Sequence, residues 1–154
     1  MPSSDLRQPT TSRSEQVLYT FERERYWDEF ARESDRWQRM RGPYQRRLLD
    51  VYSFMIPPNM RVLEIGCGQG DLLARLRPSF GVGIDLSPAR VERARTRHPG
   101  LIFHCGDVHE FDLGETFDYV VASDLFNDLW DVERAVSQIA KHCGPQHPVD
   151  REHL

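Results

Sequence analysis

The chain has 154 residues, 39% of them hydrophobic, which is enough for one compact domain but not for two. Its 20 basic and 24 acidic residues give a formal charge of -4, so composition favours neither nucleic acid nor anionic lipid as a partner. No stretch is long and apolar enough to span a bilayer, and the N-terminus lacks the apolar segment of a signal peptide. We therefore expect a soluble, cytoplasmic protein that binds neither nucleic acid nor membrane.

The N-terminal third predicts a tail followed by two helices. Residues 1–14 are polar and contain prolines, as in a disordered tail. Apolar residues at helical spacing predict one helix from Glu15 to Met40 and, after the Gly42-Pro43 break, a second from Tyr44 to Ile56. Residues 15–57 either form a lid over a ligand site or simply pack on the domain, and the relevant aromatic residues are Tyr26, Trp27, Trp37 and Tyr44.

Residues 58–144 alternate short apolar runs with charged segments of helix length. The runs, which we expect to be strands, are residues 62–65, 81–84, 101–103 and 119–122. Helices are predicted around Leu72 to Leu76, after Ser87-Pro88, and from Val132 to His142. The last helix should bury one face, formed by Val132, Ala135, Val136 and Ile139. This alternation predicts an α/β fold with a mostly parallel sheet.

The cysteines and histidines offer no metal site by their spacing. Cys67, Cys105 and Cys143 contain no Cys-x-x-Cys pair, so we expect three reduced thiols. The pairs His104-Cys105 and His142-Cys143 match neither a zinc knuckle nor a facial triad. We therefore predict that no metal is bound.

A glycine-rich turn joins the first strand to the following helix. It reads Glu64-Ile65-Gly66-Cys67-Gly68-Gln69-Gly70, and its glycines permit positive φ angles and close approach of a ligand to the backbone. A dinucleotide-binding turn would have a third glycine where this chain has Asp71. A nicotinamide-dependent oxidoreductase is therefore the less favoured alternative.

The segment from Val62 to Gly70 resembles motif I of class I S-adenosylmethionine-dependent methyltransferases, and the resemblance extends over residues 61–141. It implies a Rossmann-like three-layer sandwich with S-adenosyl-L-methionine as cofactor. In that family the glycine turn passes under the ligand and the acidic residue before it orients the methionine end. The corresponding residues here are Glu64, Gly66, Cys67, Gly68 and Gly70.

Two further strand ends match the family in the same way. Asp85, followed by Leu86, resembles the acid that binds the ribose hydroxyls, and its alternative role is to cap the next helix. Asp107 resembles the residue that accepts from the adenine amino group, and Val108 the residue whose amide donates to the ring. The alternative for Asp107 is an ordinary Gly-Asp turn.

The acceptor is predicted mainly from a sequence pattern that is missing at the end of the fourth strand. Relatives that methylate amide nitrogens often carry Asn/Asp-Pro-Pro-aromatic there, whereas this chain has Ser123-Asp124-Leu125-Phe126. We therefore expect methylation of an oxygen on a small-molecule or glycan-like acceptor. Candidate bases are Asp124 and His109, although the first could simply bond locally and the second could be a surface histidine.

The resemblance ends after Lys141. The family continues with strands five to seven, but residues 145–154 contain no apolar run and predict an irregular tail. The strand at 119–122 would then offer an open edge for pairing with another chain. We expect a truncated reading frame, a fragment or one piece of a split enzyme. The alternative function is thus a module that binds the cofactor without turnover.

Overall fold

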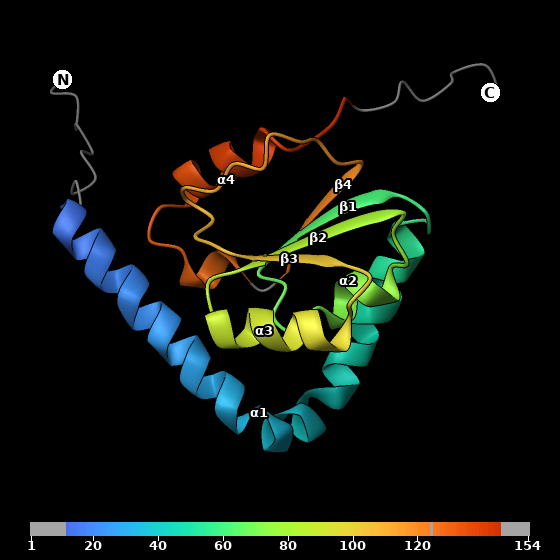
Figure 1. The fold of residues 1–154 in the computed structure, drawn as a ribbon, viewed down its shortest axis with the longest axis horizontal. Coiled ribbons are helices and arrows are strands. Elements are labelled where there is room, and N and C mark those ends of the chain that lie inside the picture. Colours follow the sequence, from blue (N-terminus) through green and yellow to red (C-terminus); the bar gives the residue numbers. More distant parts are fainter. Residues whose placement is uncertain (1–11, 124, 146–154) are drawn as a thin grey trace, which may run out of the picture.

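The computed structural model describes residues 12–123 and 125–145, and for residues 33–41 it describes the backbone alone. Figure 1 shows three layers, with one helix on one face of a central sheet and the remaining helices on the other. The elements are α1 (Arg13–Met55), β1 (Arg61–Ile65), α2 (Asp71–Arg75), β2 (Phe80–Asp85), α3 (Pro88–Arg97), β3 (Ile102–Cys105), β4 (Tyr119–Ala122), the 3-10 turn η1 (Phe126–Asp128) and α4 (Val132–Ala140). The predicted Rossmann-like α/β sandwich is confirmed.

The sheet is entirely parallel, with the strand order β3-β2-β1-β4. Glu64 of β1 is in register with Gly83 of β2, and Ile65 is in register with Ala122 of β4. The carboxyl ends of the strands therefore meet at one edge of the sheet, which is where ligands bind in open α/β folds.

The side chains of β1 alternate between two apolar cores. Val62 packs with α2, α3 and the end of α1, whereas Leu63 and Ile65 pack on the opposite face with α4. A strand covered on both faces in this way needs apolar residues at successive positions. This explains why Val62, Leu63 and Ile65 of β1 are all apolar.

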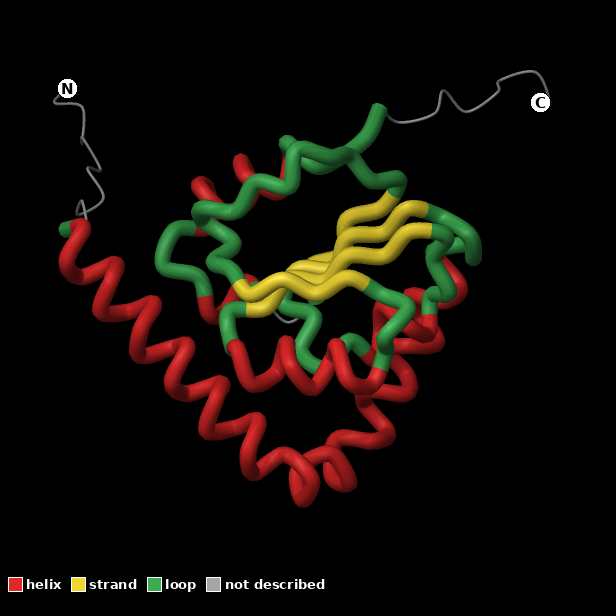
Figure 2. The backbone as a smooth tube through the Cα atoms, viewed as in Figure 1, coloured by secondary structure: helices red, strands yellow, loops and turns green. Residues whose placement is uncertain are grey.

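The two predicted N-terminal helices form one helix in the structure. α1 begins after Ser12, which caps it in a reciprocal capping box with Glu15, and continues through Pro43. Figure 2 shows that its two arms meet at a sharp bend. Proline lacks a backbone donor and crowds the preceding turn, so it can bend a helix without ending it. None of the described helices, α1 included, has the combination of length and apolarity needed to cross a bilayer.

The predicted N-terminal tail is shorter in the structure. Residues 13 and 14 are helical, so the predicted tail of residues 1–14 is too long by these residues. The rest of that prediction, on residues 1–11, lies outside the described residues, as does nearly all of the predicted tail 145–154.

The predicted apolar face of α4 is only partly buried. Ala135 is fully buried and Ile139 packs against the sheet, but Val132 and Val136 are each 47% exposed. The helix contacts the sheet along a narrower stripe than its four apolar residues would cover. The side of α4 that carries the two valines therefore lies at the surface of the described residues.

After α4 the chain returns to the edge of the sheet beside β4. Phe117 donates from its backbone N–H to the His142 carbonyl at 2.9 Å and accepts from the Gly144 N–H at 2.9 Å. These bonds make a parallel bridge between Phe117 and Cys143. This contact was not predicted, because a single bridge has no apolar run to mark it.

Candidate functional site

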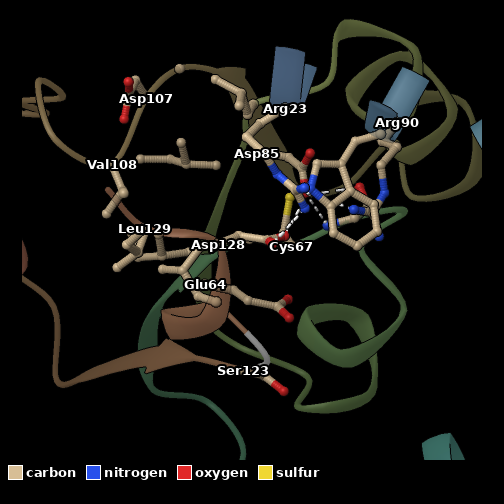
Figure 3. A pocket seen from close by; sticks show the side chains of 18 of the residues that line it. Arg23, Glu64, Cys67, Asp85, Arg90, Asp107, Val108, Ser123, Asp128 and Leu129 are labelled. Carbon is tan, nitrogen blue, oxygen red and sulfur yellow. Dashed lines mark hydrogen bonds and ion pairs between the residues drawn. The ribbon is translucent and has the colours of Figure 1, made fainter. Parts of the chain in front are cut away.

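A cavity opens at the carboxyl ends of the strands, beneath the first arm of α1 (residues 13–32). Its walls come from the β1–α2 turn, the end of β2, the segments after β3 and β4, and α1. Figure 3 shows Glu64, Asp85, Asp107 and Asp128 around this space. Most of the predicted cofactor residues line it, namely Glu64, Gly66, Cys67, Gly68, Asp85, Leu86, Asp107 and Val108.

The glycine turn adopts the backbone conformation that its sequence predicts. Gly66, Gly68 and Gly70 have φ angles of 73°, 55° and 80°, a region that side chains with a Cβ rarely adopt. The N–H groups of Gly66 and Cys67 both donate to the Ile84 carbonyl, at 2.8 and 3.0 Å. The turn is thereby fixed to the end of the neighbouring strand.

Gly70 is the one predicted cofactor residue that does not line the cavity. A Cβ at this position would lie 2.5 Å from Cζ of Phe103 and 3.2 Å from the His98 ring. The absence of a side chain therefore permits close packing of the turn on β3 and α3. In this structure Gly70 serves packing rather than the approach of a ligand.

Cys67 lines the cavity and also belongs to the apolar core beneath the turn. Its side chain is buried, and Sγ lies 2.8 Å from where a Cβ on Gly83 would be. Burial is the main reason that the pKa of the thiol is raised above its ordinary value. The side chain is thus a small apolar group of the core.

Glu64 is a buried carboxyl group with one backbone partner. It is 3% exposed and accepts a hydrogen bond from the Leu73 N–H at 3.1 Å. Burial raises its pKa to about 8, assisted by the charges of Asp85 and Asp71 and opposed by the Leu73 bond and by Arg90. The group therefore carries a proton at neutral pH, and a cation placed beside it would favour the ionised form.

Asp85 joins the end of β2 to the glycine turn. It is 4% exposed and accepts from the N–H groups of Gly68 at 2.8 Å and Ser87 at 3.0 Å. The cap of α3 is Ser87, whose Oγ accepts from the Arg90 N–H at 3.2 Å, as the sequence predicted. The capping alternative for Asp85 is therefore wrong.

Arg90 lies directly over the turn, and sequence analysis missed it. Its Nη1 is 3.6 Å from Oδ2 of Asp85, and its Nη2 is 2.6 Å from where a Cβ on Gly68 would be. The guanidinium also stacks on the Trp27 ring, 4.7 Å from the centroid. An arginine in the first turn of a helix carries no sequence signal for this position.

Asp107 and His109 form a hydrogen-bonded pair after β3. Oδ1 of Asp107 accepts from Nδ1 of His109 at 2.5 Å and from its backbone N–H at 2.9 Å, while Oδ2 accepts from Thr20 Oγ1 at 3.2 Å. Burial opposes ionisation of Asp107, but the bonds from His109 hold its pKa below the usual value. His109 lines the cavity and is 3% exposed, so the surface-histidine alternative is wrong.

The first arm of α1 covers the cavity and is tied to several strand ends. Asp128 accepts from Arg23 Nη2 at 2.5 Å and from Trp27 Nε1 at 3.0 Å. At the other side Asp28 accepts from the Ser87 hydroxyl and, at 3.2 Å, from the Ala89 N–H. The arm therefore spans the site from the loop after β2 to the turn after β4.

Of the aromatic residues predicted as a possible lid, some lie at the cavity and others are exposed. Trp27 lines the cavity, whereas Tyr26 and Tyr44 are at least half exposed. The side chain of Trp37 lies outside the described residues, and so does the candidate base Asp124. Lid residues that the sequence analysis did not single out are Tyr19, Thr20 and Arg23, which share a helical face with Trp27.

The described residues contain three free cysteines and no group of three His, Cys, Asp or Glu side chains arranged to hold a metal ion. The donor set of the cavity is instead a group of carboxylates with two arginines, Arg23 and Arg90. Such a set suits an organic ligand with cationic and hydroxyl groups.

The segment that contains the sheet matches a known protein family. The profile of the methyltransferase domain family matches residues 62–146, more than half of the chain. The matched segment begins in β1 and includes the glycine turn, Asp85, Asp107 and α4.

Curated relatives are similar over part of their length. The chain is 32% identical over 96 residues to a dTDP-4-amino-2,3,4,6-tetradeoxy-D-glucose N,N-dimethyltransferase of Saccharopolyspora spinosa, covering 58% of this chain and 39% of that protein. It is 29% identical over 90 residues to a malonyl-[acyl-carrier protein] O-methyltransferase of Bacillus anthracis, covering 54% and 34%. The chain thus spans less than half the length of these relatives.

Solved structures confirm the fold. The magnesium protoporphyrin IX methyltransferase of Synechocystis, with bound S-adenosylhomocysteine, superposes with a TM-score of 0.68 at 18% identity, covering 81% of this chain and 68% of that one. A TehB-like protein of Corynebacterium glutamicum, described as dependent on S-adenosylmethionine, gives 0.61 at 24% identity, with coverages of 75% and 68%. At these identities the likeness concerns the architecture alone.

Proposed function

This chain belongs to the methyltransferase domain family, and we propose that it binds S-adenosylmethionine in the cavity under α1 and takes part in methyl transfer to an acceptor. The observation that carries the proposal is the placement of Glu64, Asp85 and Asp107. Three consecutive strands bring these carboxyl groups to one cavity, beside a glycine turn with positive φ angles.

Each carboxyl group suits a different part of the ligand. Gly66, Cys67 and Gly68 would run beneath the methionine end, with Glu64 beside the ammonium group. Asp85, next to Leu86, would accept from the ribose hydroxyls, because carboxylates bind vicinal hydroxyls well. Asp107 would accept from the adenine amino group, and the Val108 amide would donate to the ring.

Charge supports this orientation. The ligand carries a sulfonium and an ammonium group, and the raised pKa of Glu64 means that the free site holds a proton that a cation can displace. Arg90 lies over Gly68 and already pairs with Asp85, so we infer that its guanidinium shifts when the ribose binds. Its guanidinium is held by stacking on Trp27 and by one long ion pair, so such a shift would break only these weak interactions.

The bound cofactor would supply an electrophilic methyl group. Transfer is a single displacement in which the acceptor's lone pair bonds to the methyl carbon as the carbon–sulfur bond breaks. The chain's main task is therefore to hold the two reactants in line. A base would take the acceptor's proton, and we retain Asp124 as the candidate at the end of β4.

For the acceptor, we propose the oxygen of a small molecule or glycan-like compound. The support is the Ser123-Asp124-Leu125-Phe126 sequence, which lacks the amide-methylating pattern. The names of the relatives include both N,N-dimethyl and O-methyl transfer, so nitrogen is the competing acceptor atom.

A second candidate function is cofactor binding without turnover. It is favoured by the position of β4 at the edge of the sheet. Among the described residues, the segment after α4 adds to this edge only the parallel bridge between Phe117 and Cys143. We propose that this edge pairs with another chain or another segment before an acceptor pocket is complete.

Calorimetric titration with S-adenosylmethionine tests the proposal, with NAD as the competing ligand. Wild-type chain should bind S-adenosylmethionine saturably and should not bind NAD. Asp85→Asn removes the charge but keeps the shape, and we expect it to weaken binding at least about tenfold. The matched control is Asp50→Asn, which alters an exposed aspartate outside the cavity lining and should change the affinity less than about twofold.

Binding of NAD in place of S-adenosylmethionine would contradict the proposal and favour an oxidoreductase. Release of S-adenosylhomocysteine in the presence of hydroxyl or amino acceptors separates the two candidate functions. Product release supports transfer, and tight binding without release supports the binding module.

A further inference from the structure

Contacts with Asp107, Trp130 and Arg134 restrain His109. Nδ1 bonds to Asp107 at 2.5 Å, and the ring stacks on Trp130 with centroids 4.3 Å apart and planes 24° apart. Its backbone carbonyl accepts from Nε of Arg134 at 3.0 Å. A side chain 3% exposed and restrained in this way has one defined orientation.

The bond to Asp107 fixes the tautomer of the ring. The hydrogen bonds of Asp107 favour its ionised form, which only accepts, so Nδ1 must carry the proton. In the neutral ring Nε2 is then a bare acceptor, and it is buried without a partner among the described residues. A histidine that merely filled space would cost stability here, because an apolar side chain leaves no buried acceptor unpaired. What the residue contributes is therefore its bond to Asp107.

The bond between His109 and Asp107 determines which carboxylate oxygen of Asp107 can accept a hydrogen bond from a ligand. Oδ1 receives two donors, the ring and the backbone N–H of His109, which use both of its lone pairs. Oδ2 receives one donor, the Thr20 hydroxyl of α1, and keeps a second lone pair. His109 therefore turns the carboxylate so that Oδ2 remains for a ligand in the cavity.

From this geometry we propose that His109 is a positioning residue, which acts through Asp107 to select a purine that carries a 6-amino group. The inference rests on the proposed function, in which Asp107 faces the adenine. It places His109 at the purine end of the ligand and not beside the transferred methyl group. His109 thus serves specificity for the cofactor, and the base for the acceptor lies elsewhere.

The test compares two ligands, S-adenosylhomocysteine and its analogue with hydrogen in place of the adenine amino group. Wild-type chain should prefer the amino compound by about tenfold or more, as expected for a hydrogen bond to a carboxylate. His109→Leu should lose that preference while binding the deaminated analogue within about twofold of wild type. Full preference in His109→Leu, or equal weakening of both ligands, overturns the proposal.

Two further variants of His109 test the proposal if His109→Leu does not fold. His109→Asn keeps a donor close to the place of Nδ1 and should retain the preference, whereas His109→Gln reaches toward the place of Nε2 and should lose it. The reverse pattern overturns the proposal. Wild-type chain that binds neither ligand contradicts the proposed function itself, while wild-type chain that binds both equally contradicts only the role of Asp107 and His109.

Discussion

Nε1 of Trp27 donates to Oδ2 of Asp128 at 3.0 Å, although 101 positions separate the two residues. The same carboxylate receives Arg23, and its backbone carbonyl receives the Tyr19 hydroxyl at 3.2 Å. One residue of the turn after β4 thus binds three side chains of α1. We infer that Asp128 fastens the first arm of α1 over the cavity.

Removing Asp128 should loosen that arm without unfolding the sheet. In Asp128→Ala, the Arg23 and Trp27 side chains lose their shared acceptor, so peptides from residues 13–32 should exchange amide hydrogens faster. Peptides from β1 and β2 should exchange as in wild type, because their contacts are unchanged. Exchange mass spectrometry provides the measurement, with Glu115→Ala, an exposed partner of Arg61, as the control. Unchanged exchange in residues 13–32 would show that Asp128 does not hold the arm.

Glu64 should make the folded state less stable as pH rises. Its pKa is about 8 in the folded chain, against an ordinary value of 4.5, so the folded state keeps a proton that the unfolded state has lost. The stability from this group is fully present below pH 4.5 and is lost as pH rises through about 8. Urea unfolding of wild type and Glu64→Gln between pH 5 and about pH 8 measures the difference. The difference should change by no more than about 1.4 kcal/mol per pH unit, and parallel profiles would contradict the assignment.

Binding of S-adenosylmethionine should release a proton near neutral pH. The ligand's positive charge favours ionised Glu64, so the affinity should rise from about pH 6 to about pH 8 and then level off. Titrations in buffers of different ionisation enthalpy count the released protons. Glu64→Gln should bind without this release, and an unchanged proton count in that variant would identify another group as the source.

Gly83 should be intolerant of even one added methyl group. A Cβ there would lie 2.7 Å from Cδ1 of Phe103 and 2.8 Å from Sγ of Cys67. Overpacking of this kind costs about 1–3 kcal/mol, so Gly83→Ala should lower the free energy of unfolding by that amount. Gly100→Ala is the matched control, because its Cβ would meet no atom within 4 Å. Equal unfolding free energies for the two variants would refute this account of β2 packing.

The three thiols should differ in reactivity. Cys67 is buried and its pKa is raised chiefly by that burial, whereas Cys105 and Cys143 are exposed. Because the thiolate is the reactive form, a disulfide reagent should modify two thiols in the folded chain and the third only on unfolding. In Cys67→Ser, the reagent should still modify the two exposed thiols as rapidly as in wild type. A rapid reaction of all three would mean that the turn opens readily.

The local elements were predictable because their signals lie within a few residues. The apolar runs marked all four strands within one or two residues, and the glycines of the turn permitted the positive φ angles found at Gly66, Gly68 and Gly70. Ser87 followed by Pro88 located the start of α3. The prediction for α1 failed at Pro43, because proline weakens a helix locally while contacts along both arms can sustain it.

By itself, the sequence determined the strands, the glycine turn and the acidic residues at the strand ends, because short-range sterics and periodicity act between near neighbours. Only the tertiary structure decided that His109 stacks on Trp130, that Arg90 lies over Gly68 and that Trp27 meets Asp128. These contacts depend on the path of α1 and on the conformations of the loops after the strands. Such contacts join residues remote in the chain, and no local pattern of charge or hydropathy specifies which of many surface partners they will find.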